Sequence, residues 1–517
     1  MTRSRQIAVN AASQWGVTII GCAMGILLVP FLIEKLGKDG YGLIAVIITT
    51  ASVCSLADLG VSQAVGRHLA AALARDDPKA FNEYSSTAVM VNVQVGLATA
   101  GTLLVFAEPL ARLCALPESM FDMGVFLLRS YGACSTLVTF LTPVARAVLA
   151  SHNRFDLASQ LDALRRLIQS ASLFAVLGLT NSGLVGWAVV SLVLEALSLI
   201  VFWWLAFRVH HGLRVGISGF RSARLKELCG LGSHLAILNV SSQLSNNADP
   251  FILTSQLGPG SLTFYRPSGQ LLGLFSPVIS TLANQLHPLA TTAHVQRNKE
   301  ELINILFRGT KYTMLMGVVF CGIVISLAYP LCKVWLGDVL GEQYTICAAV
   351  LTVQTGTQLF FLAAGTQWPV LLGMKCTRFA VFGRLGLAVV NVLASWALVR
   401  YTALGVLGVV IPTFVIEAIW RPLLIRHVCR VVGVSVWEYV RQAYLSALAV
   451  GGVVLTLGLA VLLLAPPNNL WSLIATAGML GLTGAALIWF VGCNPSDRTA
   501  MLAVVRSLVG QRCGSGT

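Results

Sequence analysis

Apolar runs of about 20 residues recur along the whole chain, and they constrain its fold more than any other feature. A run of roughly this length forms a helix that crosses the hydrocarbon core of a bilayer. Since 56% of the 517 residues are hydrophobic and only 11% are charged, a soluble domain of this size could not keep its apolar surface from water. The chain is therefore predicted to be an all-α polytopic membrane protein.

The apolar runs predict about fourteen transmembrane helices, and the break between the fifth and sixth depends on Asn181 and Gly183. Arg3 and Arg5 precede a first run that is too long for the apolar core of a signal peptide, so we expect a permanent helix there. The expected spans are 8–33, 41–66, 84–106, 121–149, 166–181, 183–207, 230–257, 262–285, 305–335, 345–371, 379–399, 404–425, 442–465 and 470–491.

Two short motifs occur twice in the chain. PFLIEKLG at 30–37 is echoed by PFILTSQLG at 250–258, and LASHNRF, ending at Phe155, is echoed by LLGMKCTRF, ending at Phe379. Repetition of this kind is typical of transporters whose substrate path lies between two similar lobes. The predicted organisation is an N-terminal six-helix lobe at 1–210, a cytoplasmic linker at 211–228, a C-terminal six-helix lobe at 229–430, two additional transmembrane helices at 431–493 and a cytoplasmic tail at 494–517.

Basic residues are distributed unevenly among the loops. If the N-terminus is cytoplasmic, the inside loops contain about two thirds of the 35 Lys and Arg residues and the outside loops contain far fewer. The richest inside loop runs from Arg208 to Lys226. Both termini are therefore predicted to be cytoplasmic. The formal charge of +14 does not indicate nucleic-acid binding, because the basic residues are scattered rather than gathered into a patch.

Motifs for enzymatic chemistry are missing from the sequence. The twelve cysteines form no CxxC pair and lie mostly in apolar runs, so we expect neither a disulfide nor a metal site. There is no P-loop, which argues against direct use of ATP. The outside loops are too short to form a catalytic domain. A membrane glycosyltransferase or polymerase remains an alternative without a motif to support it.

Several stretches resemble polysaccharide flippases of the multidrug/oligosaccharidyl-lipid/polysaccharide (MOP) exporter superfamily. These stretches are NAASQWG at 10–16, PFLIEKLGKDGYGL at 30–43, DLGVSQAVGRHLA at 58–70, and the loops that end at Phe155 and Phe379. The resemblance implies a flippase that moves a polyprenyl-pyrophosphate-linked oligosaccharide from the inner to the outer leaflet of a bacterial cytoplasmic membrane. A cation-coupled multidrug exporter shares the fold and is the alternative within transporters.

The resemblance also implies partners and an energy source. The substrate would be a lipid-linked oligosaccharide in contact with membrane lipids, and a polysaccharide polymerase and other biosynthesis proteins are expected partners. No cofactor is expected, and a gradient of H⁺ or Na⁺ would supply the energy. The physiological setting would be the synthesis of surface polysaccharide, including lipopolysaccharide.

Three arginines are candidate ligands for the pyrophosphate. Arg129 and Arg266 lie near the outer ends of the fourth and eighth spans, and Arg146 lies near the inner end of the fourth. A charge within the membrane is costly unless it faces water, a cavity or a partner. The planar guanidinium matches phosphate oxygens with two parallel hydrogen bonds. Pairing with a carboxylate or with helix carbonyls is the structural alternative.

Acidic residues within the spans are candidates for ion coupling. Glu195 and Glu417 lie near mid-depth in the sixth and twelfth spans with nearly the offset of the repeat, so they are candidate symmetry mates. Asp58 belongs to the DLG stretch, where a helix-bending or capping role and a role in proton handling are both open.

Asp249 ends a polar stripe on the seventh helix. The stripe contains Asn239, Ser242 and Asn246, and its spacing of three and four residues places all four side chains on one helical face. A proton or sodium site completed by Asn391 is one interpretation, and hydrogen bonding between helices is the other.

Overall fold

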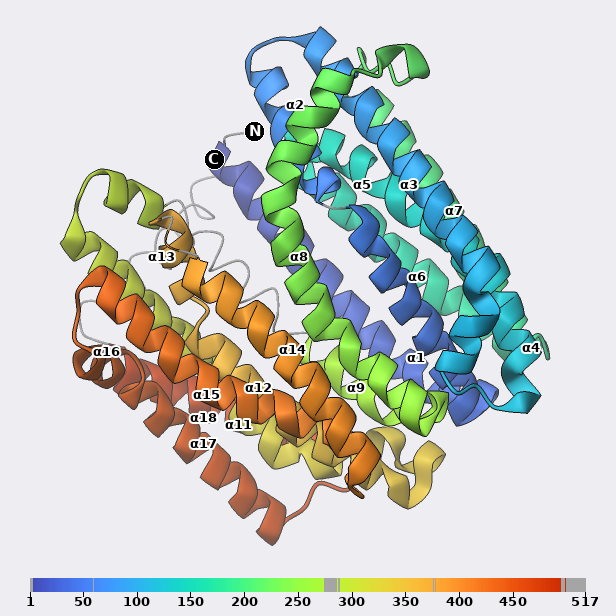
Figure 1. Ribbon diagram of the computed structural model, residues 1–517. Helices are drawn as coiled ribbons and strands as arrows, with labels where there is room; N and C mark the ends of the chain where they lie inside the picture. Colours follow the sequence, from blue (N-terminus) through green and yellow to red (C-terminus); the bar gives the residue numbers. More distant parts are fainter. Residues whose placement is uncertain are drawn as a thin grey trace, which may run out of the picture. The chain divides into compact units, whose positions relative to one another are not determined.

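The computed structural model describes residues 3–58, 60–273, 286, 289–374, 376, 378–493 and 498, with the backbone alone at 3–15, 18, 19, 22, 63 and 230–246. Every regular element in these ranges is a helix, which confirms the predicted all-α class (Figure 1). Within them, nine helical stretches are long and apolar enough to cross a membrane, and one of these, 299–373, contains more than one helix. The count of fourteen spans stays a prediction.

The chain divides into two compact units, which comprise residues 1–277 with 381–412 and residues 278–380 with 413–517. These units do not coincide with the predicted lobes, because residues 229–277 belong to the first unit. The units reflect packing contacts, whereas the lobes were inferred from sequence repetition. The lobe boundaries therefore stay a prediction.

Unit 1 contains most of the elements that position the candidate site. They are α1 (Arg3–Cys54), η1 (Ser55–Asp58), α2 (Val61–Ala74), α3 (Pro78–Leu113), α4 (Glu118–Leu127), η2 (Leu128–Gly132), α5 (Ala133–Ser151), α6 (Phe155–Leu179), α7 (Gly183–Val209), η3 (Ile217–Gly219), α8 (Ser222–Leu257), η4 (Pro259–Ser261) and α9 (Leu262–Leu272).

The core of unit 1 lies where α2, α3, α5 and α7 meet. Val65, Phe81, Val148 and Phe202 are buried together there. α1 packs against α6, α8 and α9. Helix α1 therefore lies beside the two helices that carry Asp249 and Arg266.

Glycines in left-handed conformations mark matching breaks in the two halves of the chain. Gly37 interrupts α1 with φ 75° and ψ 172°, and Gly258 ends α8 with φ 81° and ψ 171°. Gly183 and Gly405 both have φ 54°. Backbone of this kind is almost restricted to glycine. The separation between Gly37 and Gly258 along the chain equals that between Gly183 and Gly405 to within one residue, which supports the internal repeat.

The span predicted at 41–66 is not one continuous helix. α1 ends at Cys54, the turn η1 follows, and α2 begins at Val61. The carboxylate of Asp58 accepts hydrogen bonds from the Ser62 backbone N–H at 3.2 Å and the Ser62 hydroxyl at 2.7 Å. Gly60 has φ 77° just before α2. The hydrogen bonds from Ser62 therefore correspond to the capping role that was expected for Asp58.

Unit 2 is built around the long helix α11 (Lys299–Leu340). Other helices of this part of the chain are η5 (Gly341–Gln343), α12 (Tyr344–Ala363), α13 (Gln367–Gly373), α14 (Arg378–Tyr401), α15 (Leu407–Val432), α16 (Val436–Ala443), α17 (Leu445–Leu464), α18 (Leu470–Leu487) and η6 (Ile488–Gly492). Residues 381–412 of α14 and α15 belong to unit 1.

The C-terminal helices of unit 2 are attached to its body by buried hydrogen bonds. Tyr439 and Thr310 share a bond of 2.7 Å, and the Gln367 amide donates to the Tyr444 hydroxyl at 3.0 Å. Because buried polar groups are costly when unpaired, these bonds hold α16 and α17 against α11 and α13.

Candidate functional site

The first element of the candidate site is a buried carboxylate on α8. Asp249 is 4% exposed, and its Oδ2 atom accepts a hydrogen bond of 3.2 Å from the Tyr265 hydroxyl on α9. Its Oδ1 atom has no hydrogen-bond partner among the described residues. Burial with a single phenol donor disfavours the charged carboxylate unless a cation is near. The side chain is therefore suited to binding a proton or a small cation.

The second element is Arg266, which follows Tyr265 on α9. Its Nη2 atom donates to the Ala45 carbonyl of α1 at 3.2 Å and to the Thr49 hydroxyl. The Nε atom is buried without a hydrogen-bond partner. Arg266 forms no ion pair within the part of the chain whose side chains are described. A buried N–H without an acceptor is costly, so this guanidinium retains capacity for an anion.

Proline directly follows both charged residues. Pro250 lies inside α8 and Pro267 lies inside α9. A proline within a helix removes one backbone hydrogen bond and bends the chain. The two prolines therefore place local distortions in α8 and α9 beside Asp249 and Arg266.

Arg146 is paired with a carboxylate. Its Nη1 atom donates to Asp162 Oδ2 at 2.9 Å, Nη2 donates to Oδ1, and the guanidinium lies 4.3 Å from the centre of the Phe202 ring. The contacts join α5, α6 and α7. The positive charge is offset in this state, so Arg146 would bind an anion only after Asp162 is released.

Arg129 is also paired. Its Nη2 atom donates to Glu108 at 2.9 Å and its Nε atom donates to the Leu104 carbonyl at 3.1 Å. The residue lies in the π-helical turn η2, beside a cavity of about 640 Å³ that Glu108 and Asp122 also line. Arg129 is already paired with Glu108, and a second carboxylate lines the same cavity, so the surroundings do not favour a dianion.

The two candidate symmetry mates have different partners. Glu195 accepts a hydrogen bond of 3.0 Å from the Tyr131 hydroxyl, while Glu417 forms a buried ion pair of 2.7 Å with Arg421. Each glutamate lies 12 residues after its left-handed glycine, Gly183 or Gly405. The positions match the repeat, but their chemical surroundings do not.

The polar stripe is described only at its end. The side chains of Asn239, Ser242 and Asn246 lie outside the described residues. Asn391 is buried in α14 at 7% exposure. Whether these amides complete a site around Asp249 stays a prediction.

Sequence patterns identified the charged residues but not their partners. Thr49, Tyr131, Asp162 and Tyr265 come from other helices than the residues they contact. Of the pairings described above, only Glu417 with Arg421 had a local signal, because these residues are four apart on α15. The other pairings depend on how distant helices pack.

Comparisons with known proteins agree with this architecture. A family model described as "Polysaccharide biosynthesis protein" matches residues 36–348. A Salmonella typhi protein named "Putative O-antigen transporter" is 21% identical over 350 residues, which make up 66% of this chain and 78% of that protein.

Two solved structures show the fold. The structure titled "Lipid II flippase MurJ, inward closed conformation" has a TM-score of 0.68 and 14% identity, covering 93% of this chain and 99% of its own. The structure of an inward-facing multidrug resistance MATE family transporter of the MOP superfamily has a TM-score of 0.64 and 15% identity, covering 80% of this chain and 96% of its own. The predicted superfamily fold is confirmed.

Proposed function

Because this chain belongs to the polysaccharide biosynthesis protein family, we propose that it is a flippase for a polyprenyl-pyrophosphate-linked oligosaccharide. The O-antigen transporter named among its relatives and the fold shared with a lipid II flippase support a transporter rather than an enzyme. The protein would work by alternating access in a bacterial cytoplasmic membrane, with both termini in the cytoplasm.

The observation that carries this proposal is the state of Arg266. Its guanidinium is anchored to α1 through Nη2, and its buried Nε–H lacks an acceptor. A pyrophosphate oxygen is a strong acceptor for such a donor, and the fork geometry adds specificity. Arg266 is therefore the leading headgroup ligand of the three predicted arginines, and Arg146 and Arg129 would contribute only after release of Asp162 and Glu108.

Energy for transport would come from an H⁺ or Na⁺ gradient through Asp249. The carboxylate is buried, and Tyr265 ties it to the residue beside Arg266. Binding or loss of a cation at Asp249 would change this hydrogen bond and so the position of α9 relative to α8. Glu195, Glu417, Asn246 and Asn391 are further candidates for the coupling site.

The partners follow from the proposed cargo. A lipid-linked oligosaccharide flipped to the outer leaflet would be consumed by a polysaccharide polymerase on that side. We therefore expect this chain to act beside a polymerase and the enzymes that assemble the oligosaccharide, in synthesis of surface polysaccharide.

Reconstitution tests the proposal. Full-length protein in vesicles that contain a fluorescent polyprenyl-pyrophosphate-linked oligosaccharide should make the label accessible from the opposite leaflet, and an imposed H⁺ or Na⁺ gradient should change the rate. Arg266→Ala should abolish the exchange. An inactive wild-type protein that instead confers resistance to cationic dyes in cells would favour the alternative, a cation-coupled multidrug exporter.

A further inference from the structure

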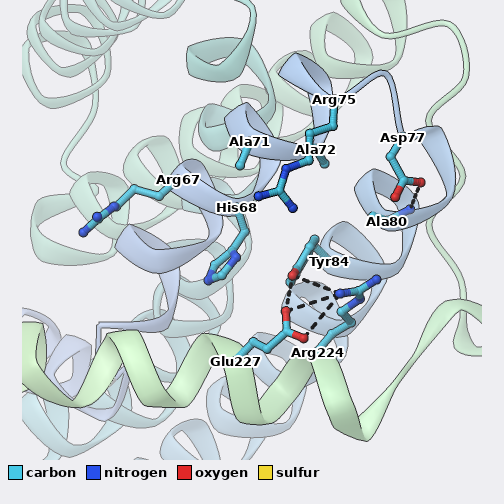
Figure 2. Close-up of a pocket in the computed structure, with 10 residues that line it drawn as sticks. All are labelled: Arg67, His68, Ala71, Ala72, Arg75, Asp77, Ala80, Tyr84, Arg224 and Glu227. Atoms are coloured by element: carbon cyan, nitrogen blue, oxygen red, sulfur yellow. Dashed lines mark hydrogen bonds and ion pairs between the residues drawn. The ribbon is translucent and has the colours of Figure 1, made fainter.

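A second polar cavity lies within unit 1, away from Asp249 and Arg266. It has a volume of about 550 Å³ and lies between α2, the first turns of α3 and the first turns of α8 (Figure 2). Its lining residues are Arg67, His68, Ala71, Ala72, Arg75, Asp77, Ala80, Tyr84, Arg224 and Glu227. These residues come from three separate segments of the chain, so no pattern along the sequence brings them together.

The wall formed by α3 and α8 is electrostatically balanced. Arg224 donates to Glu83 at 3.1 Å and contacts Glu227 at 3.3 Å, and its guanidinium lies 4.7 Å from the centre of the Tyr84 ring. The Tyr84 hydroxyl donates to Glu227. This hydrogen bond lowers the pKa of the Glu227 carboxyl, so the group stays ionised at neutral pH. Each charge on this wall therefore has an opposite charge beside it.

The wall formed by α2 carries unpaired positive charge. Arg67 and Arg75 are exposed and form no ion pair with any side chain that the structure describes. Arg75 caps the C-terminal end of α2. With Ala71 between them at spacings of four residues, Arg67 and Arg75 lie on the same side of this helix, about 12 Å apart along its axis. Figure 2 shows the Arg75 guanidinium turned back toward His68 and Tyr84, while Arg67 extends outward.

A buried polar atom beside this wall also lacks a partner. His68 stacks on Tyr84 with ring centroids 4.7 Å apart, and its Nε2 atom has no hydrogen-bond partner among the described residues. Burial lowers the pKa of His68, so the ring is neutral at pH 7 and one of its nitrogens is a donor. Asp77 also lines the cavity, where it caps α3 by accepting from the Ala80 N–H at 2.9 Å, and no ion pair between it and Arg67 or Arg75 is present among the described residues.

The position of the cavity favours a lipid over a soluble anion. Its α3 wall consists of the first turns of a helix, Pro78–Leu113, that is long and apolar enough to span the membrane. The start of this helix therefore lies at headgroup depth, on the side that the basic loops place in the cytoplasm. Basic pockets between membrane helices on that side are suited to phosphate headgroups.

We propose that this cavity binds the phosphate of an anionic lipid headgroup, with Arg67 and Arg75 supplying the charge and the small side chain of Ala71 leaving room between them. The phosphate comes either from a membrane phospholipid or from the polyprenyl pyrophosphate cargo. A phospholipid source does not depend on the proposed flippase function, whereas the cargo as source rests on that function.

The test uses full-length protein in detergent and native mass spectrometry of lipid binding. The probes are phosphatidylglycerol, polyprenyl diphosphate, diacylglycerol as a phosphate-free lipid, and inorganic phosphate. The double variant Arg67→Gln/Arg75→Gln removes the charge, and Ala71→Leu fills the space while keeping the charge. Arg112→Gln is the matched control, because Arg112 is an exposed arginine at the other end of α3.

We expect the double variant and Ala71→Leu to weaken binding of at least one phosphate lipid by about tenfold or more. Arg112→Gln should leave it unchanged, and diacylglycerol should respond to none of the variants. If the variants lose binding of polyprenyl diphosphate alone, the cargo is the source of the bound phosphate. If they lose binding of phosphatidylglycerol, the source is a membrane lipid. Unchanged binding of both lipids, an equal loss in Arg112→Gln, or binding of inorganic phosphate only would overturn the proposal.

Transport is measured separately, so the two proposals fail independently. Variants that lose lipid binding but still flip the oligosaccharide leave the flippase proposal intact. A wild-type protein that binds the lipid through Arg67 and Arg75 but flips nothing leaves the lipid site intact.

Discussion

The Tyr265 hydroxyl donates a hydrogen bond to Asp249, and the next residue after Tyr265 is the anchored Arg266. A buried acid on α8 and a buried cation on α9 are thus joined through one phenol. Occupancy of the acid by a cation and of the arginine by an anion would both act on the same turn of α9. If Asp249 binds the coupling ion and Arg266 binds the headgroup, as proposed, this arrangement would couple the two binding events.

Asp249→Asn should abolish gradient-driven transport with little change in protein level. The amide retains the shape and can still accept from Tyr265, but it cannot carry the negative charge that a proton or sodium site requires. Transport in vesicles with and without a gradient measures the effect. Tyr265→Phe is the partner variant and should cost about 1 kcal/mol of stability through the lost hydrogen bond. Wild-type transport by Asp249→Asn would leave the carboxylate with a structural role only.

Arg266→Ala should abolish flipping while the protein remains folded in the membrane. Thr49 keeps its own hydrogen bond to the Ala45 carbonyl at 2.7 Å, so removal of the guanidinium leaves no new buried polar group there. Arg266→Lys should restore flipping only in part, because lysine retains the positive charge but lacks the planar guanidinium that donates two parallel hydrogen bonds. Membrane protein level is measured beside complementation of surface polysaccharide. Full complementation by the alanine variant would remove Arg266 from the substrate site.

Arg146 and Asp162 should behave as a structural pair. Alanine at either position should lower thermal stability and protein level together with transport, because the remaining partner loses its counter-charge. Since the side chains are 39% and 23% exposed, a double-mutant cycle should give a coupling of about 1 kcal/mol. Arg129→Ala, which breaks a pair with side chains 43% and 48% exposed, should cost less than Arg146→Ala. A coupling near zero would mean that the Arg146 pair does not contribute to folding.

Gly37→Ala and Gly258→Ala should both destabilise the protein, by about 1–3 kcal/mol each. Each glycine has a positive φ and ψ near 170°, a conformation that alanine avoids. Gly101→Ala is the matched control, because Gly101 lies inside α3 with open space around it and alanine favours the helix. Thermal unfolding in detergent compares the three variants. Similar stability of all three variants would show that the backbone at Gly37 and Gly258 tolerates a residue other than glycine.

Single-cysteine labelling should place Ser218 in the cytoplasm and Asn468 outside. Both residues are exposed, so access is limited by the membrane rather than by burial. The twelve native cysteines are first replaced, and a membrane-impermeant maleimide is then added to cells with a permeabilised outer membrane. Asn468→Cys should react and Ser218→Cys should not. The opposite pattern would reverse the predicted orientation.

The sequence by itself determined the all-α class of this membrane protein and the approximate location of many of its apolar helices. Apolar length fixes membrane-spanning helices because lipid leaves backbone groups no partner outside the helix. The repeated PF…LG motifs also marked two breaks, since glycine is almost the only residue that tolerates the backbone found at Gly37 and Gly258. The charged residues within the spans were evident for a similar reason, because charge is rare and costly there.

Only the tertiary structure decided what these charges do. Arg129, Arg146 and Arg266 look alike in sequence, yet two are paired with carboxylates and the third is held by a carbonyl and a hydroxyl of α1. The partners are set by helix packing between segments far apart in the chain, which periodicity along one helix does not encode. The cavity that Arg67 and Arg75 line was not evident from the sequence for the same reason, because its walls come from three separate segments, α2, α3 and α8.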